Sequence, residues 1–159
     1  MSSERLIFEQ PPEHFDPKLE AATCFISVGD RFLFLKRHPD DFAGGLWALP
    51  GGKVEKILEE SPQQAAIREV EEEVEIVLDE STVVHLQTVF VRYPHLDFIY
   101  HMFGSQLTAF PETIVLNARE HTEFQWLTLA QALELPLIPG EIECIHLVYG
   151  SDLSRAPLK

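Results

Sequence analysis

The sequence predicts an α/β/α sandwich, in which a mixed central β-sheet carries a helix on each side. Three observations support this fold class. β-rich runs recur in both halves of the chain, one strongly patterned helix separates them, and another helix follows a Pro-Gly break near the end. A length of 159 residues and a hydrophobic content of 45% suit one domain spanning 1–159. We expect its core at about 20–149, with a loose tail from about 151.

Strands are expected where β-branched and aromatic residues cluster between turn signals. Thr23–Val28 and Arg31–Lys36 are separated by Gly-Asp, which is typical of a hairpin. Val83–Arg92 and Phe98–Thr108 form a second pair around a Tyr-Pro-His turn. The other expected strands are residues 6–8, Leu46–Leu49 and Phe124–Leu127.

The patterned helix begins at a capping box. Ser61 can serve as the N-cap, Pro62 as the first helical residue, and Gln64 as the third position that completes the box. The apolar stripe of this helix consists of Ala66, Ile67, Val70 and Val74. Two more helices are expected, Leu129–Leu133 with Thr128 as N-cap and about Glu141–Tyr149 after Pro139-Gly140.

Glutamate crowds the end of the patterned helix, where it fills five of the seven positions 69–75. Like charges three or four residues apart on a helix repel one another, so such a cluster often has a compensating cation. Glu69, Glu72 and Glu73 are spaced i, i+3 and i+4 and therefore project from one face. Carboxylates are hard oxygen ligands that suit Mg²⁺ or Mn²⁺. The alternative is a solvated acidic face without a metal.

Around this cluster the chain resembles the Nudix hydrolase family. The family's spaced box is matched in residue type by Gly52, Glu60, Arg68, Glu69, Val70, Glu72, Glu73 and Ile76. Two features depart from the box. Seven residues instead of five separate Gly52 from Glu60, which places a two-residue insertion at 56–59. Glu75 stands where the family has glycine, so the helix is expected to end differently or to run on.

The resemblance implies a Nudix-type fold, a Mg²⁺ (or Mn²⁺) cofactor and catalysis by the carboxylates of the box. Glu69, Glu72 and Glu73 would bind the metal or orient its water, and the Gly51 carbonyl would contribute to the site. Arg68 completes the catalytic set, and Glu60 would support the helix face or hold Arg68. Enzymes of this family often use a further acid from a loop. Here that acid is Glu120, as a metal ligand or the general base, with Glu123 as its rival; either one can instead be an ordinary surface acid.

Several residues outside the box are candidates for contact with a nucleotide. Arg37 ends a β-rich run and could hold a phosphate, as could Lys53 after the glycine turn; both can also be surface charges. Candidates for stacking on a base are Phe25, Phe42, Trp47, Tyr93 and Phe103, although aromatic residues in strands more often belong to the core. His38, His95, His101 and His121 lack zinc spacing and are interpreted as structural or surface residues.

The net charge, the apolar runs and the cysteines indicate which classes of partner and which cellular compartment to expect. The net charge of −14 argues against binding to a nucleic-acid polymer, but a cation can still bring in a small phosphorylated substrate. No apolar run reaches the length of a membrane span, and two distant cysteines suit a reducing cytoplasm. We expect a cytoplasmic protein and leave a homodimer open.

The leading function is hydrolysis of a nucleoside diphosphate linked to another moiety. The segment from Gly45 to Glu55 looks like the MutT-like branch of the family, which acts on nucleoside triphosphates. A nucleotide-sugar or dinucleotide hydrolase of the same fold is the alternative. An isoprenoid-diphosphate isomerase has no added support in the sequence. A noncatalytic nucleotide-binding module is disfavoured, because every expected carboxylate of the box is present.

Overall fold

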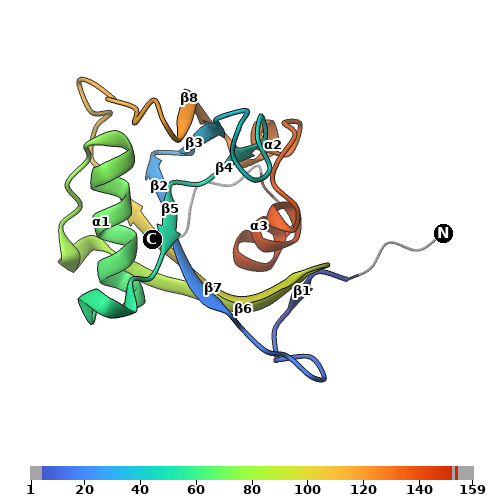
Figure 1. Ribbon diagram of the computed structural model, residues 1–159. Coiled ribbons are helices and arrows are strands. Elements are labelled where there is room, and N and C mark those ends of the chain that lie inside the picture. Colours follow the sequence, from blue (N-terminus) through green and yellow to red (C-terminus); the bar gives the residue numbers. More distant parts are fainter. Residues whose placement is uncertain (1–4, 152, 154–159) are drawn as a thin grey trace.

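An eight-stranded sheet forms the centre of the computed structural model, which describes residues 5–151 and 153. Its strand order is β1-β6-β7-β2-β3-β4, with β5 paired to β2 and β8 paired to β3. Helix α1 covers one side, and α2 and α3 lie on the other (Figure 1). This arrangement of a mixed sheet between helices is the expected α/β/α sandwich. The loose tail expected from about residue 151 falls mostly outside the described residues.

Most elements agree with the expected ones, but the expected glycine turn forms strand β5, and β8 begins at His121 instead of Phe124. The strands are β1 Ile7–Phe8, β2 Leu19–Val28, β3 Arg31–Arg37, β4 Trp47–Ala48, β5 Gly51–Lys53, β6 Val84–Tyr93, β7 Leu96–Gln106 and β8 His121–Leu127. The α-helices are α1 Pro62–Val74, α2 Leu129–Ala132 and α3 Glu141–Tyr149. Short 3₁₀ turns occur at Lys56–Leu58 and Glu80–Thr82.

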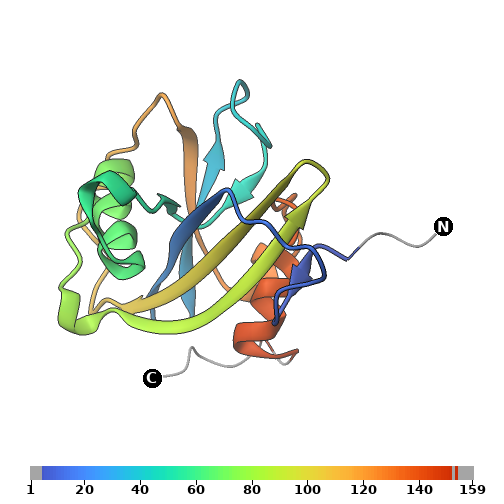
Figure 2. The same cartoon turned by 60° about the horizontal axis from the view of Figure 1, so that its bottom comes forward.

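Strand β2 is the branch point of the sheet. It pairs in parallel with β7 along most of its length. On its other side it pairs antiparallel with β5 over residues 21–23 and with β3 only at residues 27–28. The sheet therefore forks between β5 and β3, while β6 and β7 curve as one long ribbon beneath the fork (Figure 2).

Successive side chains of β2 and β3 pack alternately into two separate hydrophobic cores. Cys24, Ile26, Leu33 and Leu35 pack in the core under α1, together with Ala65, Ala66, Val70 and Val74 of the helix. Their neighbours Phe25, Phe32 and Phe34 face the core under α2 and α3, with Leu129, Ala132, Cys144 and Ile145. Both faces of these strands are buried, as the period of two along a strand requires in a layered sandwich.

Helix α1 begins as expected but does not end as expected. The capping box is formed, since Ser61 Oγ accepts from the Gln64 amide and the Gln64 side chain accepts from the Ser61 amide. The prediction that the helix ends differently or runs on was wrong. Glu75 adopts the left-handed conformation, with φ of 58°, at the position where the family has glycine. The loop supports this end, because the amides of Val115 and Asn117 donate to the Val74 and Glu73 carbonyls.

The two-residue insertion is absorbed by the first 3₁₀ turn. Lys56–Leu58 forms the turn, and Glu59 closes it in the left-handed conformation with φ of 53°. After this turn, Glu60 still contacts Arg68 of α1. Among the described residues, no helix is both long and apolar enough to cross a membrane.

Candidate active site

Arg68 ties the loop before α1 to the helix itself. Its Nε and Nη2 donate to the two carboxylate oxygens of Glu60 at 3.0 and 2.7 Å. Nη2 also donates to the Lys53 carbonyl at 3.1 Å, and Glu60 accepts from the Glu55 amide at 2.8 Å. The guanidinium contact lowers the pKa of Glu60. Glu60 therefore holds Arg68 despite the insertion, through a bidentate pair that fixes the loop.

The same guanidinium offsets part of the repulsion among the glutamates of α1. Nη1 of Arg68 donates to Glu69 at 2.9 Å and to the two oxygens of Glu72 at 3.1 and 3.3 Å. The two acids differ in burial, because the Glu69 side chain is 13% exposed and that of Glu72 is 54% exposed. Glu72 therefore lies on the solvent side of the cluster.

Glu73 lies at the buried end of the cluster, next to strand β5. Its Oε1 accepts a hydrogen bond from the Gly51 amide at 2.7 Å. Burial raises the pKa of Glu73 well above its usual value, more than the Gly51 hydrogen bond lowers it. A buried carboxylate is costly without a positive partner, so this site favours either a proton or a cation at Glu73.

Glu69 rests directly on strand β5, at Gly52. A Cβ atom at Gly52 would lie 2.5 Å from the carboxyl carbon of Glu69, so a larger residue would displace this side chain. Burial also raises the pKa of Glu69, with a further contribution from the nearby Glu120. The glycine at this position thus allows a carboxylate to lie flat against the backbone of β5.

Glu120 and His121 complete the cluster from the opposite side of the site. Ligand atoms of Glu73, Glu120 and His121 all lie within 4.8 Å of one another. The His121 ring is buried, and its Nδ1 lies 3.7 Å from Glu73 Oε2 without a hydrogen-bond partner. Burial lowers the pKa of His121 to about 4, so the ring is neutral near pH 7. Two carboxylates and an unpartnered imidazole nitrogen make a donor set that fits a divalent cation.

Glu123, the rival of Glu120, points elsewhere. It lies within β8, and its carboxylate pairs with the Lys36 ammonium at 3.2 Å on the surface. The loop that precedes β8 thus brings Glu120, rather than Glu123, to the carboxylates of α1. His121 was interpreted from the sequence as a structural or surface residue. Its place beside Glu73 depends on the pairing of β8 with β3, which no local spacing reveals.

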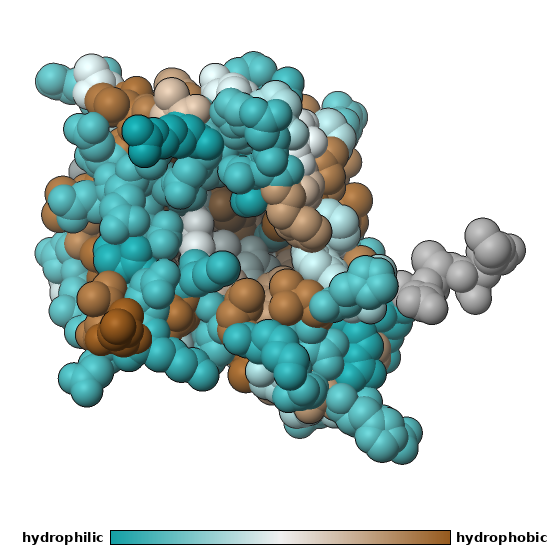
Figure 3. Space-filling view, in the orientation of Figure 1, coloured by the Kyte–Doolittle hydropathy of each residue, from teal (hydrophilic) through white to brown (hydrophobic). Residues whose placement is uncertain are grey.

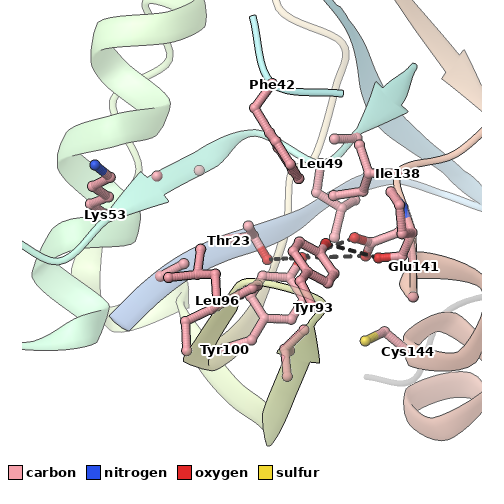
Figure 4. A pocket seen from close by; sticks show the side chains of 18 of the residues that line it. Thr23, Phe42, Leu49, Lys53, Tyr93, Leu96, Tyr100, Ile138, Glu141 and Cys144 are labelled. Atoms are coloured by element: carbon pink, nitrogen blue, oxygen red, sulfur yellow. Dashed lines mark hydrogen bonds between the residues drawn. The ribbon is translucent and has the colours of Figure 1, made fainter. Parts of the chain in front are cut away.

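A pocket of about 260 Å³ opens in the fork of the sheet. At one end it is lined by β5, from Gly51 to Lys53, and at the other by Glu141 at the start of α3 (Figure 4). In Figure 3 the same face is hollowed between the α1 side and the α3 side. Phe42 and Tyr93 stack at the pocket with ring centroids 5.7 Å apart. Because Gly51 also bonds Glu73, the pocket adjoins the acidic cluster.

The candidate contact residues divide between the pocket and the core. Arg37 and Lys53 both line the pocket, and Arg37 Nε donates to the Phe42 carbonyl at 2.7 Å. Of the candidate stacking residues, Phe42 and Tyr93 line the pocket. The other three candidates, Phe25, Trp47 and Phe103, are buried in the two cores.

Sequence reasoning missed Glu141. Its side chain is buried in the pocket wall, and the Tyr100 hydroxyl lies 3.1 Å from Oε2 and 3.3 Å from Oε1. Burial raises the pKa of Glu141 to about 7. In the sequence, Glu141 resembles an ordinary acid in the first turn of a helix, where glutamate is common. The Pro-Gly break before it marks the helix start but carries no signal of burial.

Comparison with known proteins identifies the family of this chain. The NUDIX domain family model matches residues 17–148. The chain is 32% identical over 130 residues to a CTP pyrophosphohydrolase of Escherichia coli, covering 80% of this chain and 89% of that protein. It is 36% identical over 78 residues to an 8-oxo-dGTP diphosphatase of Proteus vulgaris, covering 48% and 66% respectively.

A solved structure of a MutT NUDIX hydrolase from Burkholderia pseudomallei superposes with a TM-score of 0.69 at 25% identity. That match covers 82% of this chain and 97% of the other. The chain therefore belongs to the Nudix hydrolase family and is a pyrophosphohydrolase, an enzyme that cleaves phosphoanhydride bonds.

Proposed function

We propose that this enzyme is a Mg²⁺- or Mn²⁺-dependent hydrolase of nucleoside triphosphates that releases a nucleoside monophosphate and pyrophosphate. The observation that carries the proposal is the continuity of pocket and acidic cluster at Gly51, which lines the pocket and donates to Glu73. A base held in the pocket would place its phosphates over β5 and beside the carboxylates. The names of the two relatives support a nucleoside triphosphate substrate.

Glu69, Glu73 and Glu120 would hold the cation, with the Gly51 carbonyl and the more exposed Glu72 as further ligands. When bound, the cation would neutralise charge on the phosphate oxygens and make an attacking water more acidic. The fit rests on the clustered oxygen donors and on the buried, unpartnered Nδ1 of His121. Mg²⁺ favours oxygen ligands, whereas Mn²⁺ also accepts an imidazole nitrogen.

The chain's own residues then divide the remaining tasks. Arg37 and Lys53 would attract the phosphates from the wall of the pocket. A carboxylate oxygen of Glu120 would take a proton from the attacking water while the water oxygen bonds to the α-phosphorus. The bond from the α-phosphorus to the bridging oxygen would break, and that oxygen would leave with the pyrophosphate. Arg68 would act through the carboxylates that it positions, because its donors are engaged with Glu60, Glu69 and Glu72.

Product analysis with a panel of substrates tests this function. The purified enzyme would be given CTP, GTP, ATP, UTP, a nucleotide sugar and a dinucleotide, each with Mg²⁺, with Mn²⁺ and with chelator. We expect pyrophosphate and a nucleoside monophosphate from at least one triphosphate, with no turnover in chelator. Preferred cleavage of the nucleotide sugar or the dinucleotide would replace this proposal by the alternative. Binding without turnover of any substrate would indicate a noncatalytic module.

The proposal includes a cytoplasmic location and a small nucleotide as partner, without a nucleic-acid polymer. Both Cys24 and Cys144 are buried free thiols, which suits a reducing compartment. The net charge of −14 opposes binding to a polyanion. The open question of a homodimer would be answered by sedimentation equilibrium of the full chain across a range of concentrations.

A further inference from the structure

An imidazole nitrogen faces the acidic cluster without a partner. Nδ1 of His121 lies 3.7 Å from Glu73 Oε2, and the His121 residue is only 3% exposed. In the part of the chain that the structure describes, it is the one buried side-chain nitrogen or oxygen atom without a hydrogen-bond partner. Leaving such an atom unpaired is costly, so a partner from outside the chain is the simplest reason for its position.

A bulge in β8 turns His121 toward this cluster. Successive residues of a strand point to opposite faces, and Trp126 packs against the core under α1. Glu123 is therefore on the other face, and a regular strand would place His121 on that face too. The pairing with β3 skips Thr122, which is the extra residue of a bulge. His121 consequently changes face and lies beside Glu73.

The backbone around this histidine is held on both sides. The His121 amide donates to the Asn117 carbonyl at 3.0 Å, and the Glu120 carbonyl accepts from the His38 amide at 2.8 Å. Two neighbouring residues of the chain thus present their side chains to one site from a fixed backbone. A ligand atom held in this way needs little rearrangement to bind an ion.

The spacing of the donor atoms suits a shared cation better than a hydrogen bond. The 3.7 Å between His121 Nδ1 and Glu73 Oε2 exceeds the usual N–H···O length of about 2.7–3.2 Å. Two donors bound about 2.1 Å from one ion lie about 3 to 4 Å apart. Glu120 supplies a third donor, since the three ligand atoms all lie within 4.8 Å of one another.

We propose that Nδ1 of His121 is a nitrogen ligand of the cation and makes the site prefer a transition-metal ion such as Mn²⁺ over Mg²⁺. This inference rests on the proposed function, because it concerns the cation of that site. The resemblance to the family implies oxygen ligands alone, namely the carboxylates and the Gly51 carbonyl. His121 lies outside that set and would determine which ion the set accepts.

Ligand chemistry explains the preference. Mg²⁺ is a hard ion that takes oxygen ligands and gives up its waters reluctantly. First-row transition-metal ions bind mixed nitrogen and oxygen sites, with an affinity that rises from Mn²⁺ along the series. In His121→Asn the amide oxygen can lie near the position of Nδ1. The donor set would then consist of oxygens alone, so the preference for Mn²⁺ should shrink.

Pulsed electron paramagnetic resonance of the Mn²⁺-loaded, nucleotide-free protein detects the bond directly. A nitrogen bound to Mn²⁺ modulates the electron spin echo. We expect this modulation in the wild type and its loss in His121→Asn. The control is His95→Asn, which changes an exposed histidine in the turn between β6 and β7 and should keep the modulation.

Titration with Mn²⁺, followed by competition with Mg²⁺, measures the preference without any turnover. In His121→Asn we expect the ratio of the Mg²⁺ and Mn²⁺ dissociation constants to fall by about tenfold. In His95→Asn the ratio should stay at the wild-type value. An unchanged ratio in folded His121→Asn would overturn the proposed preference.

Isotope labelling keeps the test decisive if His121→Asn does not fold. In wild-type protein made with ¹⁵N-histidine, the modulation should change from the ¹⁴N to the ¹⁵N pattern. No nitrogen modulation in the wild type, or a modulation that survives in His121→Asn, would overturn the inference. If His121→Asn then still lowered kcat, His121 would be a positioning residue for Glu73.

These measurements also separate this inference from the proposed function. A histidine-nitrogen modulation in a protein that hydrolyses no triphosphate would reject the function and keep His121 as a metal ligand. Metal-dependent hydrolysis of triphosphates by a protein without this modulation would reject the ligand and keep the function.

Discussion

At the scale of single residues, Glu73 is the carboxylate of α1 most dependent on a compensating charge. It is buried, and the Gly51 amide is its close hydrogen-bond partner. Glu73→Gln keeps the shape and can still accept from Gly51. We expect kcat to fall by about two orders of magnitude or more, because the cation supplies several kcal/mol of transition-state stabilisation. Steady-state kinetics with Mg²⁺ or Mn²⁺ measure the loss, and near-wild-type turnover would contradict the assignment.

The same substitution should stabilise the metal-free protein. Burial raises the pKa of Glu73 in the folded state, so folding is favoured while the group is protonated and loses stability as the pH rises through that pKa. Glutamine stays neutral at every pH. In chelator we expect Glu73→Gln to melt above the wild type at pH 8, with the difference shrinking toward pH 5. A lower melting temperature at pH 8 would assign Glu73 a structural role instead.

Glu120 and Glu123 offer a matched pair of acids, one just before β8 and one within it. Glu120 adjoins Glu73 and His121, whereas Glu123 pairs with Lys36 on the surface. If Glu120 is the general base, Glu120→Gln should depress kcat far more than KM and should shift the acidic limb of the pH–rate profile. Glu123→Gln loses one exposed ion pair and should change little. If neither variant loses kcat, the base lies on α1, most simply at Glu69.

At the scale of elements, the end of α1 carries a residue in an unfavourable backbone conformation. Glu75 has φ of 58°, a left-handed position that costs an L-residue about 1 kcal/mol more than glycine. Glu75→Gly should therefore stabilise the protein by about 1 kcal/mol, a rise of a few degrees in Tm. Glu71→Gly removes an equivalent exposed charge within the helix and should destabilise it. A stabilising effect in both variants would point to charge relief rather than conformation.

Local chemistry predicted the start of α1 but not its end. The capping box depends on residues three apart, and the structure forms it at Ser61 and Gln64. The end depends on the loop amides of Val115 and Asn117, which donate to the last turn of the helix. Those contacts join segments about 40 residues apart in the chain. They let Glu75 hold a conformation that its own side chain disfavours.

In the candidate site, too, local sequence patterns predicted some features, while others depend on contacts between distant segments. Spacing along α1 grouped Glu69, Glu72 and Glu73, and the resemblance to the family added Arg68 and Glu120. Spacing did not separate exposed Glu72 from buried Glu73, because burial comes from the packing of α1 on β5. His121 and Glu141 were missed for the same physical reason. Each is an ordinary polar residue until the sheet places it against a distant partner.

At the scale of the whole molecule, Glu141 should make stability depend on pH. Its folded-state pKa is raised from 4.5 to about 7 by burial, with Tyr100 lowering it and Glu143 raising it. The native state therefore binds more protons between these values, and stability falls as the pH rises through that window. The shift corresponds to about 3 kcal/mol at pH 8. Denaturant melts of ligand-free Glu141→Gln should lack this contribution. The stability of the variant relative to the wild type should therefore be higher at pH 8 than at pH 5. An identical pH dependence in both proteins would contradict it.

The division of the interior into two cores has a consequence for how such an enzyme can change. The carboxylates of α1 are supported by the core under that helix, whereas Tyr100 and Cys144 of the pocket belong to the core under α2 and α3. Substitutions that reshape the pocket therefore repack a different set of side chains from those that hold the carboxylates. A lineage could acquire a new preferred base by drift on one side of the sheet, while selection preserves the hydrolytic apparatus on the other.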